Sequence, residues 1–305
     1  TKITTQSKYA NLDAQQHYQQ YLSKVQLIIR ELKSAYTELY LSHKRYATLE
    51  KSTVLLSQIF DVTTQKYAIN RAPQTEVLRA QVELSRAENE LRAAKDDIAI
   101  AEAVLNASLN RKIDDPVGEP DEPEILLNDM ELEALYDLAK EHAPHLKASG
   151  LMYDKAEVMR SMARQTYLPD FNLEIYQMDN AMQDRKYMVG ITFPLWFLGK
   201  QNNMVREAEA ERQMALAMYQ ATENEVFLAV KKAKLQVERN RRGAELYRSS
   251  ILPQAEAVLK SALVEYGVDK LEFPMLIDDL NLLIQLELEY AQAQAEYFVA
   301  IAELE

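Results

Sequence analysis

Residues 171–197 read FNLEIYQMDNAMQDRKYMVGITFPLWF, and their pattern differs from that of the rest of the 305-residue chain. Apolar residues alternate with polar or small ones in both halves of this stretch, which is typical of β-strands with one apolar face. The stretch therefore predicts two antiparallel strands, at about residues 170–177 and 187–195, joined by the connection MDNAMQDRKY. The apolar face of the second strand contains Val189, Ile191, Phe193 and Leu195.

A two-stranded hairpin is only marginally stable by itself, so this one needs a partner. One solution is a membrane β-barrel, whose strands need about 9–11 residues and present an apolar face to lipid. The other is a soluble hairpin packed against a helix, which the alternation fits equally well. The pattern alone leaves both solutions open.

The chain before the hairpin is mostly helical in pattern. Residues 2–66 predict one long helix that ends at the turn sequence YAINRAPQTEV (67–77), and a second helix follows from about 75 to 110. The segment NRKIDDPVGEPDEPEILLND (110–129) is rich in proline and acidic residues and predicts irregular structure. A further helix is expected from 131 to 164, interrupted near Pro144.

The chain after the hairpin repeats the helical arrangement of its beginning. Residues 200–264 predict a long helix, about 100 Å at 1.5 Å per residue, that ends at YGVDKLEFP (266–274). A returning helix then runs to Glu305, and Pro253 inside the long helix predicts a kink or a joint. With only 6 Gly and 9 Pro in the chain, few turns interrupt these helices.

The two helical hairpins superpose in sequence. At an offset of 199 residues, Tyr67 meets Tyr266 and Asn70 meets Asp269, which indicates a tandem repeat. The predicted fold class is mainly α, with duplicated long helical hairpins that form an α-barrel protomer and one β-hairpin that contributes to a transmembrane β-barrel. The predicted divisions are the first-repeat hairpin 1–111, an irregular linker 112–130, a connecting helix 131–168, the β-hairpin 169–198 and the second-repeat hairpin 199–305.

Composition and motifs exclude several classes of function. The net charge of −12 argues against nucleic acid as a partner, since phosphate binding needs a cationic face. The absence of cysteine excludes disulfides, thiol nucleophiles and Cys-ligated metals. No Gly-rich phosphate loop, HExxH motif or nucleophile elbow is present, so we expect neither an enzyme nor a cofactor. His142 and His145 lie three residues apart, but without a third ligand nearby we expect surface histidines and no metal site.

Five local patterns occur in the order found in a known family. They are LNASLNR (105–111), HAPHLKAS (142–149), YLPDFNLE (167–174), FPLWFLGKQNNMVREAEAE (193–211) and SILPQAEAVLKSALVEYGVDKLEFPMLIDD (250–279). Together with the repeated hairpins and the strand pair, they resemble the TolC family of outer-membrane efflux proteins, the outer-membrane factors of tripartite efflux systems, over essentially the whole chain. The stretch ILPQAEAVL (251–259) and the ending AQAEYFVAIAELE (293–305) resemble most the heavy-metal efflux branch.

The resemblance implies a passive exit duct in the outer membrane of a Gram-negative bacterium, with most of the helical mass in the periplasm. It implies a homotrimer that closes a 12-stranded barrel in lipid and conducts substrates from a periplasmic adaptor protein and an inner-membrane pump of the resistance-nodulation-division class. The family has two strand pairs per protomer, and this chain has one, so we expect an N-terminally truncated chain. The alternative from a different class is a soluble coiled-coil scaffold or interaction protein built from duplicated hairpins.

The family also implies roles for the two turns. Their exposed residues would contact the adaptor, and acidic side chains just beyond the second turn would form the channel gate, with Asp278 matching a family acid and Asp279 following it. Acids near a helix start also interact favourably with the helix dipole. This alternative explains the presence of Asp278 and Asp279 without a gate. A hydrogen bond between Tyr266 and Glu76 would link the turns; the family's basic partner is Leu271 here, so its ion pair is missing unless Lys270 replaces it. The expected adaptor-contacting residues are Asn70, Arg71, Pro73, Asp269, Lys270 and Pro274.

Overall fold

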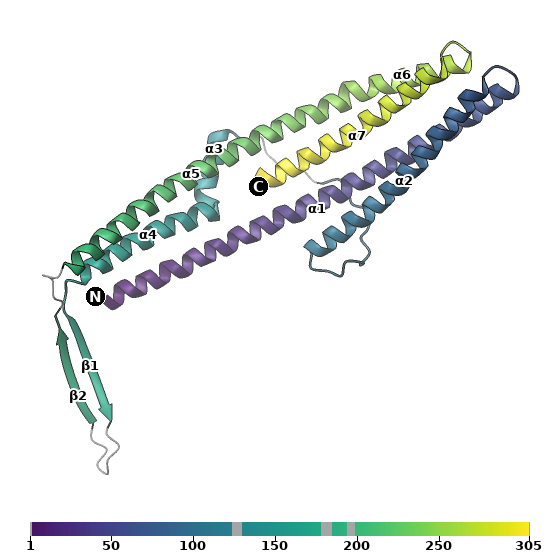
Figure 1. Cartoon of the computed structure of the whole chain (residues 1–305). Helices are drawn as coiled ribbons and strands as arrows, with labels where there is room; N and C mark the ends of the chain where they lie inside the picture. The colour runs from purple at the N-terminus through teal and green to yellow at the C-terminus, as the bar shows by residue number, and fades with distance from the viewer. Residues whose placement is uncertain (1, 124–129, 178–184, 194–198, 305) are drawn as a thin grey trace. The chain divides into compact units, whose positions relative to one another are not determined.

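The computed structural model describes residues 2–123, 130–177, 185–193 and 199–304, which form long helices and one strand pair (Figure 1). The predicted break at Pro144 and the two predicted helical hairpins are present, with boundaries within a few residues of those expected. In chain order the elements are α1 (Lys2–Ala68), α2 (Gln74–Ser108), α3 (Leu132–His142), α4 (Pro144–Gln165), β1 (Asp170–Gln177), β2 (Arg185–Thr192), α5 (Lys200–Leu246), the π-helical turn η2 (Tyr247–Ile251), α6 (Leu252–Gly267) and α7 (Phe273–Leu304).

The chain divides into two units. Unit 1 consists of Thr1–Val25 and Glu133–Ala229, and unit 2 consists of Gln26–Leu132 and Val230–Glu305. Unit 1 therefore holds α3, α4 and the strand pair, and unit 2 holds α2, α6, α7 and both inter-helix turns. Among the helices within the described ranges, none is both long enough and apolar enough to cross a membrane.

The π-helical turn before α6 follows from the proline that the sequence placed inside a helix. Pro253 has no backbone N–H, so it cannot continue the regular hydrogen-bond ladder of the preceding turn. The N–H of Leu252 bonds to the carbonyl of Tyr247, five residues back, which widens the helix by one residue at this point. The predicted kink or joint is thus a π-bulge between α5 and α6.

The core of unit 2 near the turns is shared by four helices. The main apolar cluster includes Tyr266 and Phe273, whose rings meet edge to face with centroids 6.0 Å apart. Side chains from α1, α2, α6 and α7 contact one another there, so the two helical hairpins of the repeat pack against each other. The buried members are Leu56, Ile59, Ala80, Ala87, Leu259, Ala262, Tyr266, Phe273, Leu276, Ile277 and Leu280.

Helix α2 has buried alanines at regular intervals of seven residues. Ala80, Ala87, Ala94 and Ala101 are 1–6% exposed. A seven-residue spacing keeps a single seam of the helix facing its neighbours, as in coiled coils. Small side chains at that seam allow close helix–helix packing, since the interaxial distance depends on the residues at the contact.

This seam predicts a position-specific effect on stability. Ala94→Leu inserts a larger side chain into a closely packed position, and we expect it to lower the free energy of unfolding by about 1–3 kcal/mol. Ala93→Leu makes the same change at the adjacent exposed position, where an effect within about 0.5 kcal/mol is expected. Chemical denaturation followed by circular dichroism measures both, and equal effects of the two substitutions would contradict the seam.

The strand pair has a defined register. Strands β1 and β2 are antiparallel, with Phe171 opposite Ile191 and Leu173 opposite Val189. These four side chains therefore share one face, as the alternation predicted. The second strand spans Arg185–Thr192 rather than the expected 187–195, because its pairing with β1 begins at Arg185, opposite Gln177.

Candidate functional site

The two inter-helix turns have the same backbone geometry. In the first turn (residues 69–73) Asn70 has φ 60°, and in the second turn (residues 268–272) Asp269 has φ 59°. The N–H of Asn70 bonds to the Tyr67 carbonyl at 3.0 Å, and the N–H of Asp269 bonds to the Tyr266 carbonyl at 3.3 Å. The next N–H in each turn bonds five residues back, which completes a Schellman motif at the end of both α1 and α6. The prediction that Asn70 and Asp269 accept a left-handed backbone is confirmed, and the equivalent geometry supports the repeat.

Tyr266 links the two turns from the centre of the packed core. Its side chain is 4% exposed, and its hydroxyl donates to Glu76 Oε2 at 3.2 Å. Thr63 Oγ1 lies 3.1 Å from the same hydroxyl. Burial raises the pKa of Tyr266 above its usual value of 10.0, so the phenol stays protonated at neutral pH and remains a donor. The hydrogen bond predicted between Tyr266 and Glu76 is confirmed.

A second link between the turns is an ion pair that the sequence reasoning missed. Lys66 Nζ lies 2.6 Å from Asp269 Oδ1, and Arg71 lies 3.8 Å from the other carboxylate oxygen. Lys270 forms no ion pair within the described part of the chain, so the suggestion that it supplies the missing cation is wrong. The cation comes from the first hairpin instead, since Lys66 lies in the last turn of α1. In the sequence, Lys66 is adjacent to Tyr67, one of the two aligned repeat tyrosines, and this position was the available signal that Lys66 lies at the link between the turns.

The ionisation of Asp269 sets the pH range over which this ion pair persists. The hydrogen bond from Lys66 lowers the pKa of Asp269 below its usual value of 3.8. A lowered folded-state pKa means that the link is fully present above the usual aspartate range and is lost only as pH falls through the lowered pKa. The Lys66–Asp269 link is therefore intact throughout the neutral pH range.

The residues predicted to contact the adaptor lie at the surface, whereas Ala72 of the first turn is buried. Their exposure leaves them accessible to another molecule, as the predicted adaptor contact requires, and Arg71 and Asp269 also pair with each other within the chain. The adaptor role itself stays a prediction. The exposed members of the predicted set are Asn70, Arg71, Pro73, Asp269, Lys270 and Pro274.

The two predicted gate acids lie beyond the start of α7. This helix begins at Phe273, and its first turn holds no acidic residue, so Asp278 and Asp279 fall in its second turn. Because the helix-dipole effect falls off within the first turn, it explains the two acids poorly. Asp278 is exposed and Asp279 is partly exposed, while Leu276, Ile277 and Leu280 of the same helix are buried. The acids therefore lie away from the core.

The predicted membrane-facing side chains are exposed where the structure describes them, in β2 and at Phe193 just after it. Val189 is 73% exposed, Ile191 51% and Phe193 63%. Leu195, the fourth predicted member, lies outside the described residues. The cross-strand partners Phe171 and Leu173 are 72% and 67% exposed, so the face is apolar and uncovered on both strands. Its assignment to lipid stays a prediction at this point.

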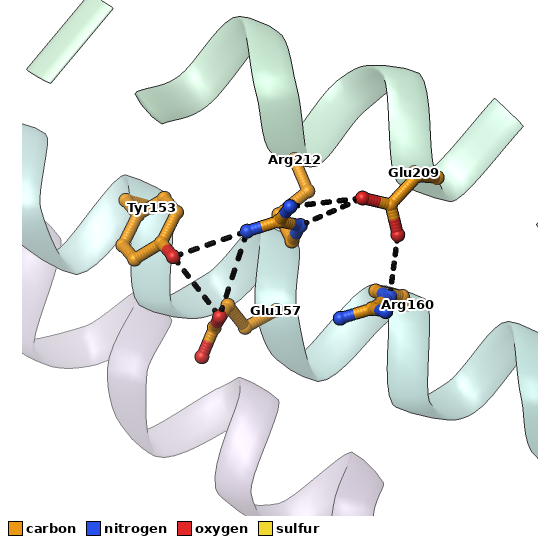
Figure 2. Close-up of polar contacts among 5 residues, drawn as sticks. All are labelled: Tyr153, Glu157, Arg160, Glu209 and Arg212. Carbon is orange, nitrogen blue, oxygen red and sulfur yellow. Dashed lines mark hydrogen bonds and ion pairs between the residues drawn. The ribbon is translucent and has the colours of Figure 1, made fainter. Parts of the chain in front are cut away.

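A polar network in unit 1 joins the two helices that flank the strand pair (Figure 2). Arg212 of α5 donates to Glu209 Oε1 at 2.9 and 3.1 Å and to the Tyr153 hydroxyl of α4 at 3.2 Å. Arg160 of α4 forms an ion pair with the second oxygen of Glu209, and Tyr153 donates to Glu157 at 3.0 Å. The hydrogen bond from Arg212 lowers the pKa of Glu209, which stays ionised. The network fixes the helix that enters the strand pair against the helix that leaves it.

Residues 135–269 match the outer membrane efflux protein family. The matched range begins in α3, contains the strand pair and ends at Asp269 in the second turn. The match supports the prediction of an outer-membrane efflux protein over this part of the chain, and the heavy-metal branch and the N-terminal truncation stay predictions. The matched family consists of efflux proteins rather than enzymes, in agreement with the prediction of no catalytic activity. No curated protein matches the chain by sequence at a significant level.

Several solved membrane proteins share the fold of this chain. The outer-membrane channel OprN is 16% identical with a TM-score of 0.86, over 99% of this chain and 70% of OprN. The outer membrane protein VceC from Vibrio cholerae is 17% identical with a TM-score of 0.85, over 99% and 74% of the two chains. A membrane protein from Pseudomonas aeruginosa is 17% identical with a TM-score of 0.86, over 99% and 73%. These matches confirm the predicted fold class of long helical hairpins with one strand pair.

Proposed function

We propose that this chain forms part of an outer-membrane exit duct, through which substrates leave the periplasm passively. The observation that carries the proposal is the efflux-family match across residues 135–269, which includes the strand pair and ends at Asp269, within the second turn. The fold shared with OprN and VceC supports it, and it favours the duct over a soluble scaffold. The hydrogen-bonded turns give the duct a means of closure at the periplasmic end.

The duct needs partners to receive its substrate. Three copies would enclose the channel, and a periplasmic adaptor would contact the exposed turns and transmit substrate from an inner-membrane pump. We assign the pump to the resistance-nodulation-division class from the family resemblance. We assign the system to the heavy-metal branch from the resemblance of residues 251–259 and 293–305. The exposed side chains of both turns suit an adaptor contact, because no described part of the chain covers them.

The strand pair would lie in the outer membrane, with the helices in the periplasm. Its uncovered apolar face, which includes Val189 and Ile191, suits contact with lipid hydrocarbon. The opposite face carries polar or flexible side chains such as Asn172, Glu174 and Met188. One face is thus compatible with lipid and the other with a more polar surrounding.

The function is tested by deleting the gene and measuring sensitivity to drugs and to metal ions. Loss of an exit duct raises the intracellular level of exported compounds, so the deletion strain is expected to be more sensitive to at least one class. Sensitivity to heavy-metal ions alone would support the heavy-metal branch, and sensitivity to drugs alone would overturn that branch while keeping the duct. Unchanged sensitivity to every tested compound would contradict the export function.

The lipid-facing assignment has its own test. Val189→Arg places a charge on the apolar face, where a charge near the bilayer midplane costs about 2–4 kcal/mol. We expect this variant of the full-length protein to be depleted from the outer-membrane fraction. Met188→Arg, at the neighbouring exposed position on the opposite face, is expected to retain normal membrane levels. Equal depletion of both variants would contradict the assignment.

A further inference from the structure

Lys66 links the two hairpins although it is not among the residues predicted to form the gate. It is the last basic residue of α1, and its side chain is only 12% exposed. Its ammonium lies 2.6 Å from the Asp269 carboxylate and 3.9 Å from the centroid of the Tyr266 ring, and it donates to the Tyr266 backbone carbonyl. One cation therefore contacts a side-chain anion, an aromatic face and a backbone carbonyl, all of the opposite hairpin.

The backbone contact places Lys66 at the C-terminal end of α6. The last carbonyls of a helix lack partners within the helix and carry partial negative charge. The Tyr266 carbonyl accepts a long bond of 3.3 Å from Asp269 N–H, and Lys66 supplies a second donor to it from another helix. Lys66 thus caps α6 from outside, and its position depends on the Schellman turn that holds Asp269.

The repeat makes this link one-sided. The position equivalent to Lys66 in the second hairpin is Glu265, and the position equivalent to Asp269 in the first is Asn70. A reciprocal ion pair is therefore impossible, although both turns have the same backbone geometry. The sequence thus breaks the symmetry of the repeat at the residues that join the hairpins.

We propose that Lys66 is the positioning residue that locks the second turn against the first and so holds the duct closed. This inference rests on the proposed duct function and assigns the closing role to a residue outside the Tyr266–Glu76 pair. Moving the second turn away from α1 breaks the ion pair, the carbonyl contact and the ring contact together. The three contacts therefore act as one link that is either made or lost.

The first test measures the turn itself and needs no channel. In the purified full-length protein, Lys66→Gln is expected to speed hydrogen–deuterium exchange of residues 268–272 about fivefold, because the protecting bonds of Asp269 and Lys270 N–H loosen. Arg71→Gln removes an exposed cation 3.8 Å from Asp269 and is expected to leave this exchange unchanged. Lys66→Arg retains the charge and is expected to restore at least half of the protection. Unchanged exchange in Lys66→Gln, or equal effects of Lys66→Gln and Arg71→Gln, would overturn the proposal.

The second test measures conductance in planar bilayers. Lys66→Gln is expected to raise the open fraction about fivefold, and Asp269→Asn, which keeps left-handed tolerance, is expected to act similarly. If the two residues form one link, the double variant conducts no more than the stronger single variant. Additive effects, or wild-type conductance in Lys66→Gln, would overturn the closing role. Failure of the wild type to form channels would instead contradict the duct, and the exchange measurement would still decide whether Lys66 holds the turn.

Discussion

Replacing Tyr266 with Phe and Glu76 with Gln in the full-length channel is expected to raise its conductance in planar bilayers several-fold. The Tyr266 hydroxyl donates to Glu76 across the two hairpins at 3.2 Å, and Phe removes that donor without removing the buried ring. A hydrogen bond to a charged acceptor contributes about 1.5–3 kcal/mol. In a trimer the change occurs three times, and each 1.4 kcal/mol shifts an equilibrium about tenfold. The closed state should therefore lose most of its free-energy advantage over the open state.

The repeat supplies a matched control for this experiment. Tyr67 is the equivalent tyrosine of the first hairpin, but its side chain is 44% exposed, and its hydroxyl has no hydrogen-bond partner within the described residues. Tyr67→Phe is therefore expected to leave conductance at the wild-type value. Unchanged conductance in the Tyr266/Glu76 variant, or an equal increase in Tyr67→Phe, would remove this pair from the gate.

Replacing Asp278 and Asp279 with Asn is expected to lower the cation-to-anion permeability ratio of the channel on the order of tenfold. Both acids lie in the second helical turn of α7, which follows the inter-helix turn 268–272, and they point away from the core. Three copies would form a ring of negative charge at the closed end. Such a ring concentrates cations and opposes anions at a constriction. Because both residues lie at the surface of the chain, the amides should preserve the fold, so selectivity changes without loss of assembly.

Reversal potentials in asymmetric salt measure this ratio directly. Glu272→Gln is the matched control, since Glu272 is an exposed acid in the second turn, six residues before Asp278. It is expected to shift the reversal potential much less than the double aspartate variant. A shift from Glu272→Gln as large as that from the aspartates would mean that overall charge near the turns, and not a ring at Asp278, sets the selectivity.

The architecture was largely predictable because it rests on periodicity. Alternation in residues 171–197 marked the strand pair, Pro144 marked the break between α3 and α4, and Pro253 marked the joint at η2. The aligned positions Asn70 and Asp269 predicted two equivalent turns, since few residues other than glycine accept a left-handed backbone. These features are local, and local chemistry decides them.

The Lys66 contacts were not predictable in the same way. Lys66 reads as an ordinary surface lysine near the end of a helix, and its partners lie about 200 residues later. Only the packing of the two hairpins brings its ammonium to Asp269 and the Tyr266 ring. The family pattern places the cation within the second turn, where this chain has Leu271 with Lys270 beside it, and so it gives no sign of a cation supplied by the opposite hairpin.

The single-channel conductance of the wild-type full-length protein in planar bilayers tests the central claim most directly. An exit duct closed by the linked turns is expected to give discrete, small, cation-selective conductance steps that grow when the links at Tyr266 and Lys66 are removed. Folded, membrane-inserted protein that gives no conductance steps, with or without those substitutions, would contradict the assignment of this chain to an outer-membrane duct.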